Sequence, residues 1–307
     1  MFTRILVPTD FSAPSDGALE HARGLAAAFG GMVHLLHVLP NVFLRPVVDD
    51  PRGLETAAEE QLEERLTADE RRRFLVLVAL ARSDEPADEI VRYARMHDMD
   101  AIVMGTHGRS GMSHALMGSI AEKVMRTAPC PVLTARAAGS GAGRGFKHVL
   151  VPTDFSEHSD AALDCARHVA ARFGASLHLL HVLDDRVISG SAGSELVVAE
   201  SSEVRAARAT DVEERLADRL DEGDRITLRA TTGVLFGAPA PSIASYAAGY
   251  GFDLIVMGTH GRTGLAHLLM GSVAEHVVRS ATCPVITVKH APVRAEARLP
   301  TPARAIA

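Results

Sequence analysis

The sequence predicts an α/β protein of two tandem doubly wound domains, each a five-stranded parallel sheet with helices on both faces. Three observations predict this class: the length, an internal repeat, and a regular alternation of short apolar runs with helical segments. The chain has 307 residues, and a typical domain has about 100–200, so two domains are expected. Strands that alternate with helices form βαβ units, whose strands lie parallel.

The first half of the chain returns in the second half. RILVPTDFS at 4–12 recurs as HVLVPTDFS at 148–156, and HLLHVL at 34–39 recurs at 178–183. A later glycine segment, GTHGRSGMSHALMGS at 105–119, recurs as GTHGRTGLAHLLMGS at 258–272. The first two blocks are offset by 144 residues and the third by 153, so the second copy is nine residues longer. We expect the extra length between Leu183 and about Ile226, where a solvent-side loop and helix can absorb it.

The repeat also predicts the domain boundaries. Domains are expected over residues 1–136 and 146–290. The Gly- and Ala-rich stretch 137–145 has the composition of a flexible linker. Residues 291–307 carry scattered Pro, Arg and Ala and are expected to form a disordered tail.

The elements of the first half follow in order. Residues 5–7 are a short apolar run that ends at Pro-Thr-Asp, as a buried strand would. Residues 12–29 carry apolar side chains at helical spacing, with Ser12 or Ser15 as N-cap and Gly30 beyond the end. Residues 33–39 form a second apolar strand, 54–72 a charged helix, and 74–80 a third strand.

The remaining elements continue the alternation. Residues 86–97 begin with Pro, which is favoured at the first position of a helix. Residues 101–104 form a fourth buried strand, and the glycine segment follows it directly. A helix is expected over 118–127 and a fifth strand over 131–134.

The two most distinctive motifs are expected to meet at one crevice. In open parallel sheets, ligands bind outside the carboxyl ends of the strands, where the strand order reverses. Asp10 follows the first strand, and the glycine segment follows the fourth. If these strands are neighbours at the reversal, both features face one crevice, and the same holds for Asp154 and the segment at Gly258.

The glycine segment has the chemistry of a phosphate site. A glycine after a strand allows a tight turn and lets a ligand approach without a Cβ in the way. Gly118 and Ser119 begin a helix, whose first N–H groups and positive dipole end suit a phosphate. Arg109 and Arg262 add charge beside it. The alternative is that the glycines only mark turns and that Ser119 only caps the helix.

Together these motifs resemble the universal stress protein family, as two fused domains of its ATP-binding branch. The resemblance rests on the PTD end of the first strand, HLLHV, VMGTHGR, the G-x2-G-x9-G-S pattern and the CPV strand, and covers nearly the whole chain. It implies the strand order 3-2-1-4-5 and one ATP site in each half, across the ends of the first and fourth strands. Mg²⁺ would be held mostly by the ATP phosphates.

The resemblance also implies which residues bind the nucleotide. Asp10 and Asp154 would contact the ribose or adenosine, and the backbone at Val38 and Val182 would meet the adenine edge. The residues implied around the rest of the ligand are Pro8, Thr9, Gly105, Thr106, His107, Gly108, Arg109, Gly118 and Ser119 in the first half, and Pro152, Thr153, Gly258, Thr259, His260, Gly261, Arg262, Gly271 and Ser272 in the second.

One departure separates the halves before the helix at Pro86. The first half has SDEP at 83–86, and the second has FGAP at 236–239. Asp84 and Glu85 either cap the helix or disfavour an anionic ligand nearby, and we favour capping. Asp10 likewise has a second interpretation, as a cap of the next helix turn.

Other candidate residues have simpler interpretations. His37 and His181 lie inside apolar strands and are expected to be satisfied core residues. The histidines of the glycine segment, His114 and His267 included, lack the carboxylate or Cys spacing of a metal site. The cysteines are Cys130, Cys165 and Cys283, an odd, sparse set typical of a reducing cytoplasm, and the two that precede Pro are expected to be buried.

Composition limits the partners. The net charge is −6 and there is no Trp, so nucleic-acid binding is not expected. No apolar run approaches the roughly 20 residues that span a bilayer, and the N-terminus does not have the pattern of a signal peptide. We therefore expect a cytoplasmic protein without a membrane partner.

The expected function is that of an ATP-binding stress-response regulator or sensor. No G-x4-G-K-[ST] loop and no kinase-type Asp/Asn set occur, so efficient catalysis is not expected. The alternatives are a slow ATP hydrolase or phosphotransferase, and an interaction scaffold with structural nucleotide. The fifth strands, at 132–134 and 285–287, are expected to pair within the chain, and whole chains are expected to form a homodimer; no protein partner is indicated.

Overall fold

A computed structural model describes most of the chain. The described residues are 1–41, 51–73, 75–106, 117–135, 143, 145–184, 188–189, 196–197, 201–260 and 270–289. The expected tail lies outside them, as does the expected linker except for Gly143 and Gly145. None of the helices in these ranges is long and apolar enough to cross a bilayer.

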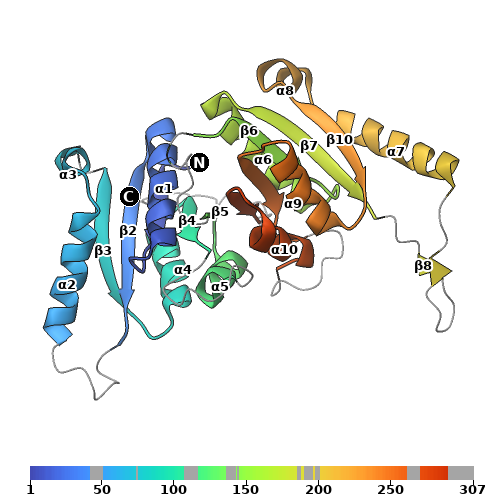
Figure 1. The fold of residues 1–307 in the computed structure, drawn as a ribbon. Coiled ribbons are helices and arrows are strands. Elements are labelled where there is room, and N and C mark those ends of the chain that lie inside the picture. The colour runs from blue at the N-terminus through green and yellow to red at the C-terminus, as the bar shows by residue number, and fades with distance from the viewer. Residues whose placement is uncertain are drawn as a thin grey trace, which may run out of the picture.

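Each half alternates strands with helices, as expected (Figure 1). The first half contains β1 (Arg4–Pro8), α1 (Ala13–Phe29), β2 (Met32–Leu39), α2 (Pro51–Glu64), α3 (Ala68–Arg73), β3 (Val76–Arg82), α4 (Pro86–Met96), β4 (Ala101–Gly105), α5 (Ser119–Thr127) and β5 (Val132–Ala135). The second half contains β6 (His148–Pro152), α6 (Glu157–Phe173), β7 (Ser176–Leu183), β8 (Ile188–Ser189), β9 (Leu196–Val197), α7 (Ser202–Ala217), α8 (Glu222–Thr227), β10 (Thr231–Phe236), α9 (Pro239–Gly249), β11 (Leu254–Gly258), α10 (Ser272–Ser280) and β12 (Val285–Val288).

The strand order confirms the predicted fold. The strands form one ten-stranded sheet in the order β10-β7-β6-β11-β12-β5-β4-β1-β2-β3. Read within each half this is 3-2-1-4-5, and all pairings inside a half of this sheet are parallel. The order reverses between β1 and β4 and between β6 and β11, so the crevice lies where the sequence predicted it.

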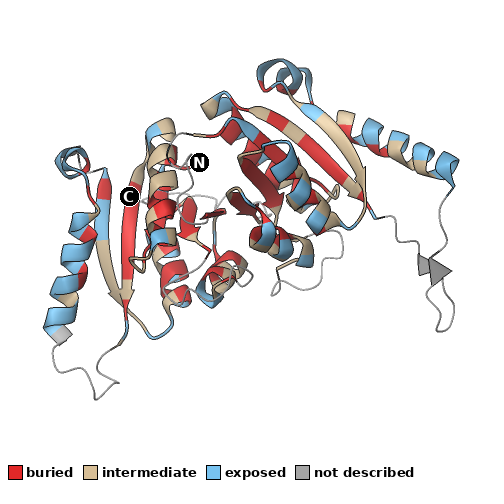
Figure 2. Cartoon of the chain, in the orientation of Figure 1, coloured by how far each residue is buried: buried red, intermediate tan, exposed pale blue. Residues whose placement is uncertain are grey.

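Side-chain alternation along the strands gives the ten-stranded sheet two buried faces. Ile5 and Val7 of β1 belong to a core cluster that also contains buried residues of α1 and α2. Leu6, between them, belongs to a second cluster with α4 and α5. Successive strand residues point to opposite faces, so helices cover both sides, and exposed positions gather on the outer surfaces of the helices (Figure 2).

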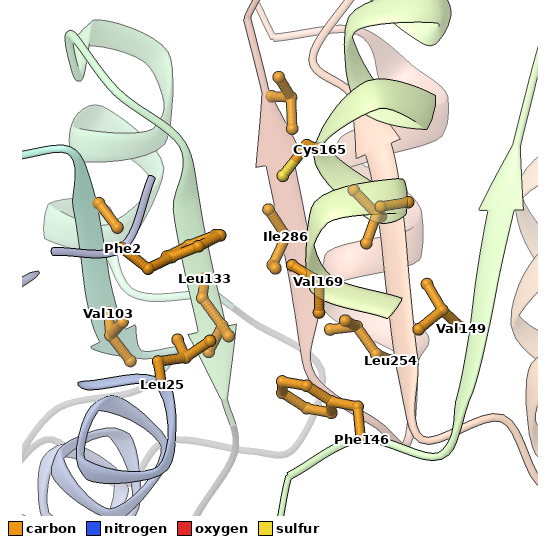
Figure 3. Close-up of a cluster of buried hydrophobic side chains, with 14 of the residues drawn as sticks. Phe2, Leu25, Val103, Leu133, Phe146, Val149, Cys165, Val169, Leu254 and Ile286 are labelled. Atoms are coloured by element: carbon orange, nitrogen blue, oxygen red, sulfur yellow. The ribbon is translucent and has the colours of Figure 1, made fainter. Parts of the chain in front are cut away.

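The two halves join through an antiparallel pairing of β5 with β12. Val285 pairs with Thr134, Ile286 with Leu133 and Thr287 with Val132, as expected for the two fifth strands. The Thr134 hydroxyl donates to the Val285 carbonyl (3.2 Å), and the Thr287 hydroxyl donates to the Val132 carbonyl (3.3 Å). Leu133 and Ile286 lie in the core cluster shared by the two halves (Figure 3).

The charged segment 54–72 differs from the prediction of one helix. Two helices, α2 and α3, take its place. The Thr67 N–H donates to Glu70 Oε2 (2.7 Å), and the Glu70 N–H donates to Thr67 Oγ1 (3.2 Å). This reciprocal capping box starts a new helix.

The nine-residue difference between the halves is the net of two changes. Arg65 and Arg219 occupy equivalent places, because each donates to an aspartate of the first helix and to the carbonyl of the preceding Phe. Their numbers differ by 154, whereas Pro86 and Pro239 differ by 153. The second half therefore gains ten residues before α8 and loses one by the start of α9.

Candidate functional site

A cavity lies at the carboxyl ends of the central strands in each half. The first has a volume of about 730 Å³, and the predicted residues that line it are Pro8, Thr9, Asp10, Val38, Gly105, Thr106, Gly118 and Ser119. The second has a volume of about 460 Å³, and the predicted residues that line it are Pro152, Thr153, Asp154, Val182, Gly258, Thr259, His260, Gly271 and Ser272. His107, Gly108, Arg109, Gly261 and Arg262 lie outside the described residues.

A hydrogen-bonded turn after β1 holds Asp10 in the cavity wall. Asp10 Oδ1 accepts from the N–H of Ser12 (3.2 Å) and from its hydroxyl (2.5 Å). Thr9 Oγ1 accepts from the Phe11 N–H (3.0 Å). Ser12 is the N-cap of α1, so the Asp10 carboxylate fixes the capping residue. Asp154 and Ser156 repeat this arrangement in the second half.

Phe11 and His37 are among the wall residues that were not predicted as part of the site. Phe11 has φ of 64°, which is uncommon for a residue with a side chain. The Phe11 ring centroid lies 4.3 Å from the His37 ring centroid and 4.8 Å from the guanidinium carbon of Arg65. Both Phe11 and His37 line the cavity. The recurrence of Phe directly after PTD in both copies was the available signal.

His37 is a buried, hydrogen-bonded core residue, as expected. It is buried, and its Nδ1 lies 2.7 Å from the carbonyl of Thr9, which accepts the ring proton. His181 makes the same contact with Thr153 at 2.7 Å. Each imidazole therefore supports the turn that carries the site aspartate.

The backbone of Val38 faces the cavity because β1 ends before it. Met32 donates to Thr3, and Leu36 accepts from Thr9, so the even-numbered residues of β2 direct their backbone groups toward β1. The β1–β2 register ends at the Pro8–Leu36 pair, whereas β2 continues beside β3 to Leu39. Alternation then turns the Val38 N–H and C=O toward the space beyond β1.

Packing against the first helix requires the first glycine of the segment, which is a reason separate from the expected approach of a ligand. A Cβ at Gly105 would lie 2.9 Å from the carbonyl carbon and Cβ of Pro14, at the start of α1. A Cβ at Gly258 would lie 2.9 Å from the carbonyl carbon of His158. In each half the glycine lets the first helix approach the fourth strand.

Gly118 is different, because it has space. It is the N-cap of α5 with φ of −64°, and a Cβ there would meet only the Thr106 oxygen, at 3.5 Å. The Gly118 N–H donates to that oxygen (2.9 Å), and Gly271 donates to Thr259 (2.8 Å). These bonds bring the two ends of each glycine segment together.

The starts of α5 and α10 can accept an anion. Among the described residues, no side chain caps either N-terminus; α1, α4 and α9 also lack such a cap, whereas Ser156 caps α6 and Ser201 caps α7. The first N–H groups of a helix and its dipole favour negative charge. Both helix starts open on the cavities, through Gly118–Ser119 and Gly271–Ser272.

The expectation that Asp84 and Glu85 cap α4 is wrong. The Glu85 side chain makes no capping bond at the start of the helix. Asp84 Oδ1 accepts from the Asn41 N–H (3.1 Å). Glu85 and Asp88 instead accept from Lys123 Nζ of α5 (3.2 and 2.9 Å), because the ammonium group on the neighbouring helix is the stronger partner.

Thiol chemistry and a built metal site find no support in the described part of the chain. Burial raises the pKa of each of the three thiols, of Cys130, Cys165 and Cys283, to about 12. Such thiols are protonated at neutral pH and are poor nucleophiles. No three His, Cys, Asp or Glu side chains of the described ranges come together as a metal site would require.

Comparisons with known proteins point to one family. A model of the "Universal stress protein family" matches residues 1–136 and 145–289. A universal stress protein of Mycolicibacterium smegmatis is 28% identical over 300 residues, which cover 93% of this chain and 96% of that protein. Universal stress protein MJ0531 of Methanocaldococcus jannaschii is 34% identical over 149 residues, 47% of this chain and 82% of that protein.

The fold also has a match along nearly its full length. The crystal structure of a universal stress protein from Archaeoglobus fulgidus has a TM-score of 0.69 and 24% sequence identity, and the match covers 95% of this chain and 100% of that one. At this identity the likeness concerns the fold alone.

Proposed function

This chain belongs to the universal stress protein family, and on that premise we propose that it is a nucleotide-dependent stress-response regulator with an ATP site in each half. The observation that carries the proposal is the convergence of three features on one cavity. These are the aspartate after the first strand, the backbone of Val38 or Val182, and a helix N-terminus without a side-chain cap.

The strand order places these three features side by side along the carboxyl ends of neighbouring strands. β2, β1 and β4 are consecutive neighbours, and adjacent strands lie about 4.8 Å apart. A nucleotide laid across their ends has its adenine beside Val38, its ribose beside Asp10, and its phosphates at the start of α5. Val182, Asp154 and α10 repeat this line in the second half.

The described residues fit the phosphates better than they fit a metal. Ser119 and Ser272 follow the N-caps and add hydroxyl donors to the backbone N–H groups. In our proposal His107, Gly108, Arg109, His260, Gly261 and Arg262 complete the phosphate shell. Mg²⁺ would enter with ATP and be held mostly by its phosphates and water.

Regulation follows from linkage. A ligand that binds the folded state stabilises it by RT ln(1 + [L]/Kd), and it favours whichever conformation binds it better. We propose that occupancy alters partner contacts in this way, in a cytoplasmic protein that forms homodimers.

The test is mass spectrometry of the small molecules released from the purified full-length chain, with calorimetric titration of ATP and Mg²⁺. We expect two adenine nucleotides per chain. The control variant combines Gly118→Asp with Gly271→Asp. Both positions have φ near −60°, and Asp is a favoured N-cap, so the helices are kept while a carboxylate takes the place of the phosphate.

The double variant should bind ATP at least about tenfold more weakly, the size expected for loss of charge-assisted hydrogen bonds. A wild-type chain that carries no nucleotide and gives no ATP binding contradicts the proposal. Steady production of ADP would favour the slow hydrolase. Nucleotide that never exchanges would favour the scaffold.

A further inference from the structure

One edge of the ten-stranded sheet is formed by β3, the last strand in the sheet order. Within the described ranges no further strand pairs with it. The Val33 N–H donates to the Leu75 carbonyl, so the odd-numbered residues of this segment direct their backbone groups toward β2. The even-numbered residues Val76, Val78 and Leu80 therefore direct theirs toward the open edge. In the part of the chain that the structure describes, these N–H and C=O groups have no partner strand.

Large apolar side chains are exposed along the same edge. Leu75 and Leu77 are each 40% exposed, and Val78 is 39% exposed, and Figure 2 shows β3 with exposed positions at the margin of the sheet. An open edge with apolar side chains is a template for pairing with another chain, and proteins that avoid such pairing place charged residues or Pro there. β3 carries neither at these three positions.

The equivalent edge of the second half, formed by β10, is polar. The first histidine of the HLLHVL repeat pairs with Leu77 in the first half and with Thr231 in the second. Leu77 therefore corresponds to Thr231, and Val78 to Thr232. The Thr231 hydroxyl lies 2.7 Å from His178 Nδ1, so a polar side chain is accommodated at this position of the fold. The fold does not require the apolar side chains of β3, which therefore need another explanation.

The side chains of β3 complement those of a second β3 that runs antiparallel to it. Ala79 and Ala81 pack against the second core cluster, and alternation places Leu75 and Leu77 on the same face. A pairing centred on Val78 sets this residue beside its own copy and joins the outward backbone groups of both strands. Leu77 then lies opposite Ala79 of the second copy, and Leu75 lies opposite Ala81. Each exposed leucine covers a small side chain, as favourable cross-strand pairs do.

The charges at the two ends of β3 favour the same orientation. Arg71 and Arg72 of α3 are exposed at its start. At its end, Arg82 contacts Glu55 of α2 (3.0 Å), and Glu59 follows one helical turn along the same side of α2. Antiparallel pairing brings the basic start of one β3 beside the acidic end of the other, whereas parallel pairing would bring like charges together.

We propose that β3 is the surface through which two copies of this chain form a homodimer, by antiparallel pairing about a two-fold axis at Val78. A two-fold axis joins the same surface of both copies, which fits a strand whose side chains and end charges complement themselves. The chain already joins its own halves by an antiparallel pairing of edge strands, β5 with β12. The proposed function includes a homodimer, and this inference rests on that part of it alone.

The test is sedimentation velocity of the full-length chain over a range of concentrations. We expect the wild type to have about twice the mass of one chain. Val78→Lys should raise the dissociation constant of the dimer about tenfold or more, because two like charges would meet at the two-fold axis. Thr232→Lys places the same charge at the equivalent position of β10 and should leave the dimer unchanged. Circular dichroism and ATP titration show whether each variant is folded and keeps its nucleotide sites.

A cysteine at the axis tests the orientation. Val78→Cys should form a disulfide between two chains under mild oxidation, because directly opposite residues of antiparallel strands lie within disulfide range. The wild type and Thr232→Cys control for the native thiols and for random collision. A dimer that persists in Val78→Lys, or that gives no cross-link in Val78→Cys, overturns the inference and leaves the proposed function standing. A wild type that stays monomeric overturns it together with the proposed homodimer, whereas a failure to bind ATP overturns only the nucleotide sites.

Discussion

At the scale of single residues, the glycines of one motif are glycine for different physical reasons. Gly105 is needed because Pro14 occupies the place of its Cβ, whereas Gly118 has open space and ordinary backbone angles. The sequence predicted a ligand role for both, and both line the cavity. Spacing alone does not tell whether a neighbouring helix also fills the space beside a glycine. Every described member of the predicted nucleotide-binding set lines one of the two cavities, and its contact with a nucleotide stays a prediction.

Replacing each of the two glycines by Ser should change the unfolding free energy at Gly105 much more than at Gly118. Gly105→Ser places a Cβ 2.9 Å from the Pro14 carbonyl carbon, and such overpacking costs about 1–3 kcal/mol of unfolding free energy. Gly118→Ser creates a favoured N-cap and should change stability by less than about 0.5 kcal/mol. Urea denaturation of both variants measures this. Equal losses would show that both glycines serve packing.

At the scale of elements, α3 is fixed by a partly buried ion pair, which the spacing of apolar residues could not indicate. Arg23 of α1 donates from Nε to Glu70 Oε1 (2.6 Å) and from Nη2 to Glu70 Oε2 (2.9 Å). Arg167 and Asp224 form the matching pair in the second half. The sequence predicted one charged helix over 54–72, and this run contains no Gly or Pro that would break it. The T-x-x-E signal of the capping box was present but is short.

Glu70 should make stability depend on acid pH. Burial raises the pKa of the Glu70 carboxyl, but the hydrogen bonds from Arg23 and Thr67 outweigh burial and leave the pKa below 4.5. A lowered carboxyl pKa gives stability that is present above pH 4.5 and is lost as the pH falls through the folded-state value. Glu70→Gln should lower the unfolding free energy at pH 7 by about 1.5–3 kcal/mol.

Urea denaturation at pH 7 and near pH 3 provides the measurement, because the wild type and Glu70→Gln should converge at the lower pH. Glu64→Gln, at an exposed position of α2, is the matched control and should change stability by less than about 0.5 kcal/mol. A difference between wild type and Glu70→Gln that stays constant with pH would show that the carboxylate charge is not the cause.

At the scale of the whole molecule, two domains share one sheet and the core clusters on its two faces. The pairing of β5 with β12 was predictable, since each fifth strand is otherwise an edge that must be covered. The side-chain contacts between the halves were not. His21 of α1 stacks on Phe146 at 6.1 Å, and Phe29 meets Phe173 edge-on at 6.3 Å. Such contacts depend on how two complete domains dock, which no periodic pattern in either half records.

Phe146 should therefore couple the unfolding of the two halves. It is 6% exposed, belongs to the shared core cluster and packs on Phe173 at 5.5 Å. Phe146→Ala should cost about 3–5 kcal/mol, and in scanning calorimetry it should divide one transition into two as the halves lose their joint core. Tyr250→Ala removes an aromatic ring that is 71% exposed and should leave the single transition intact. If Phe146→Ala lowers the melting temperature but keeps one transition, the β5–β12 pairing alone is sufficient to couple the halves.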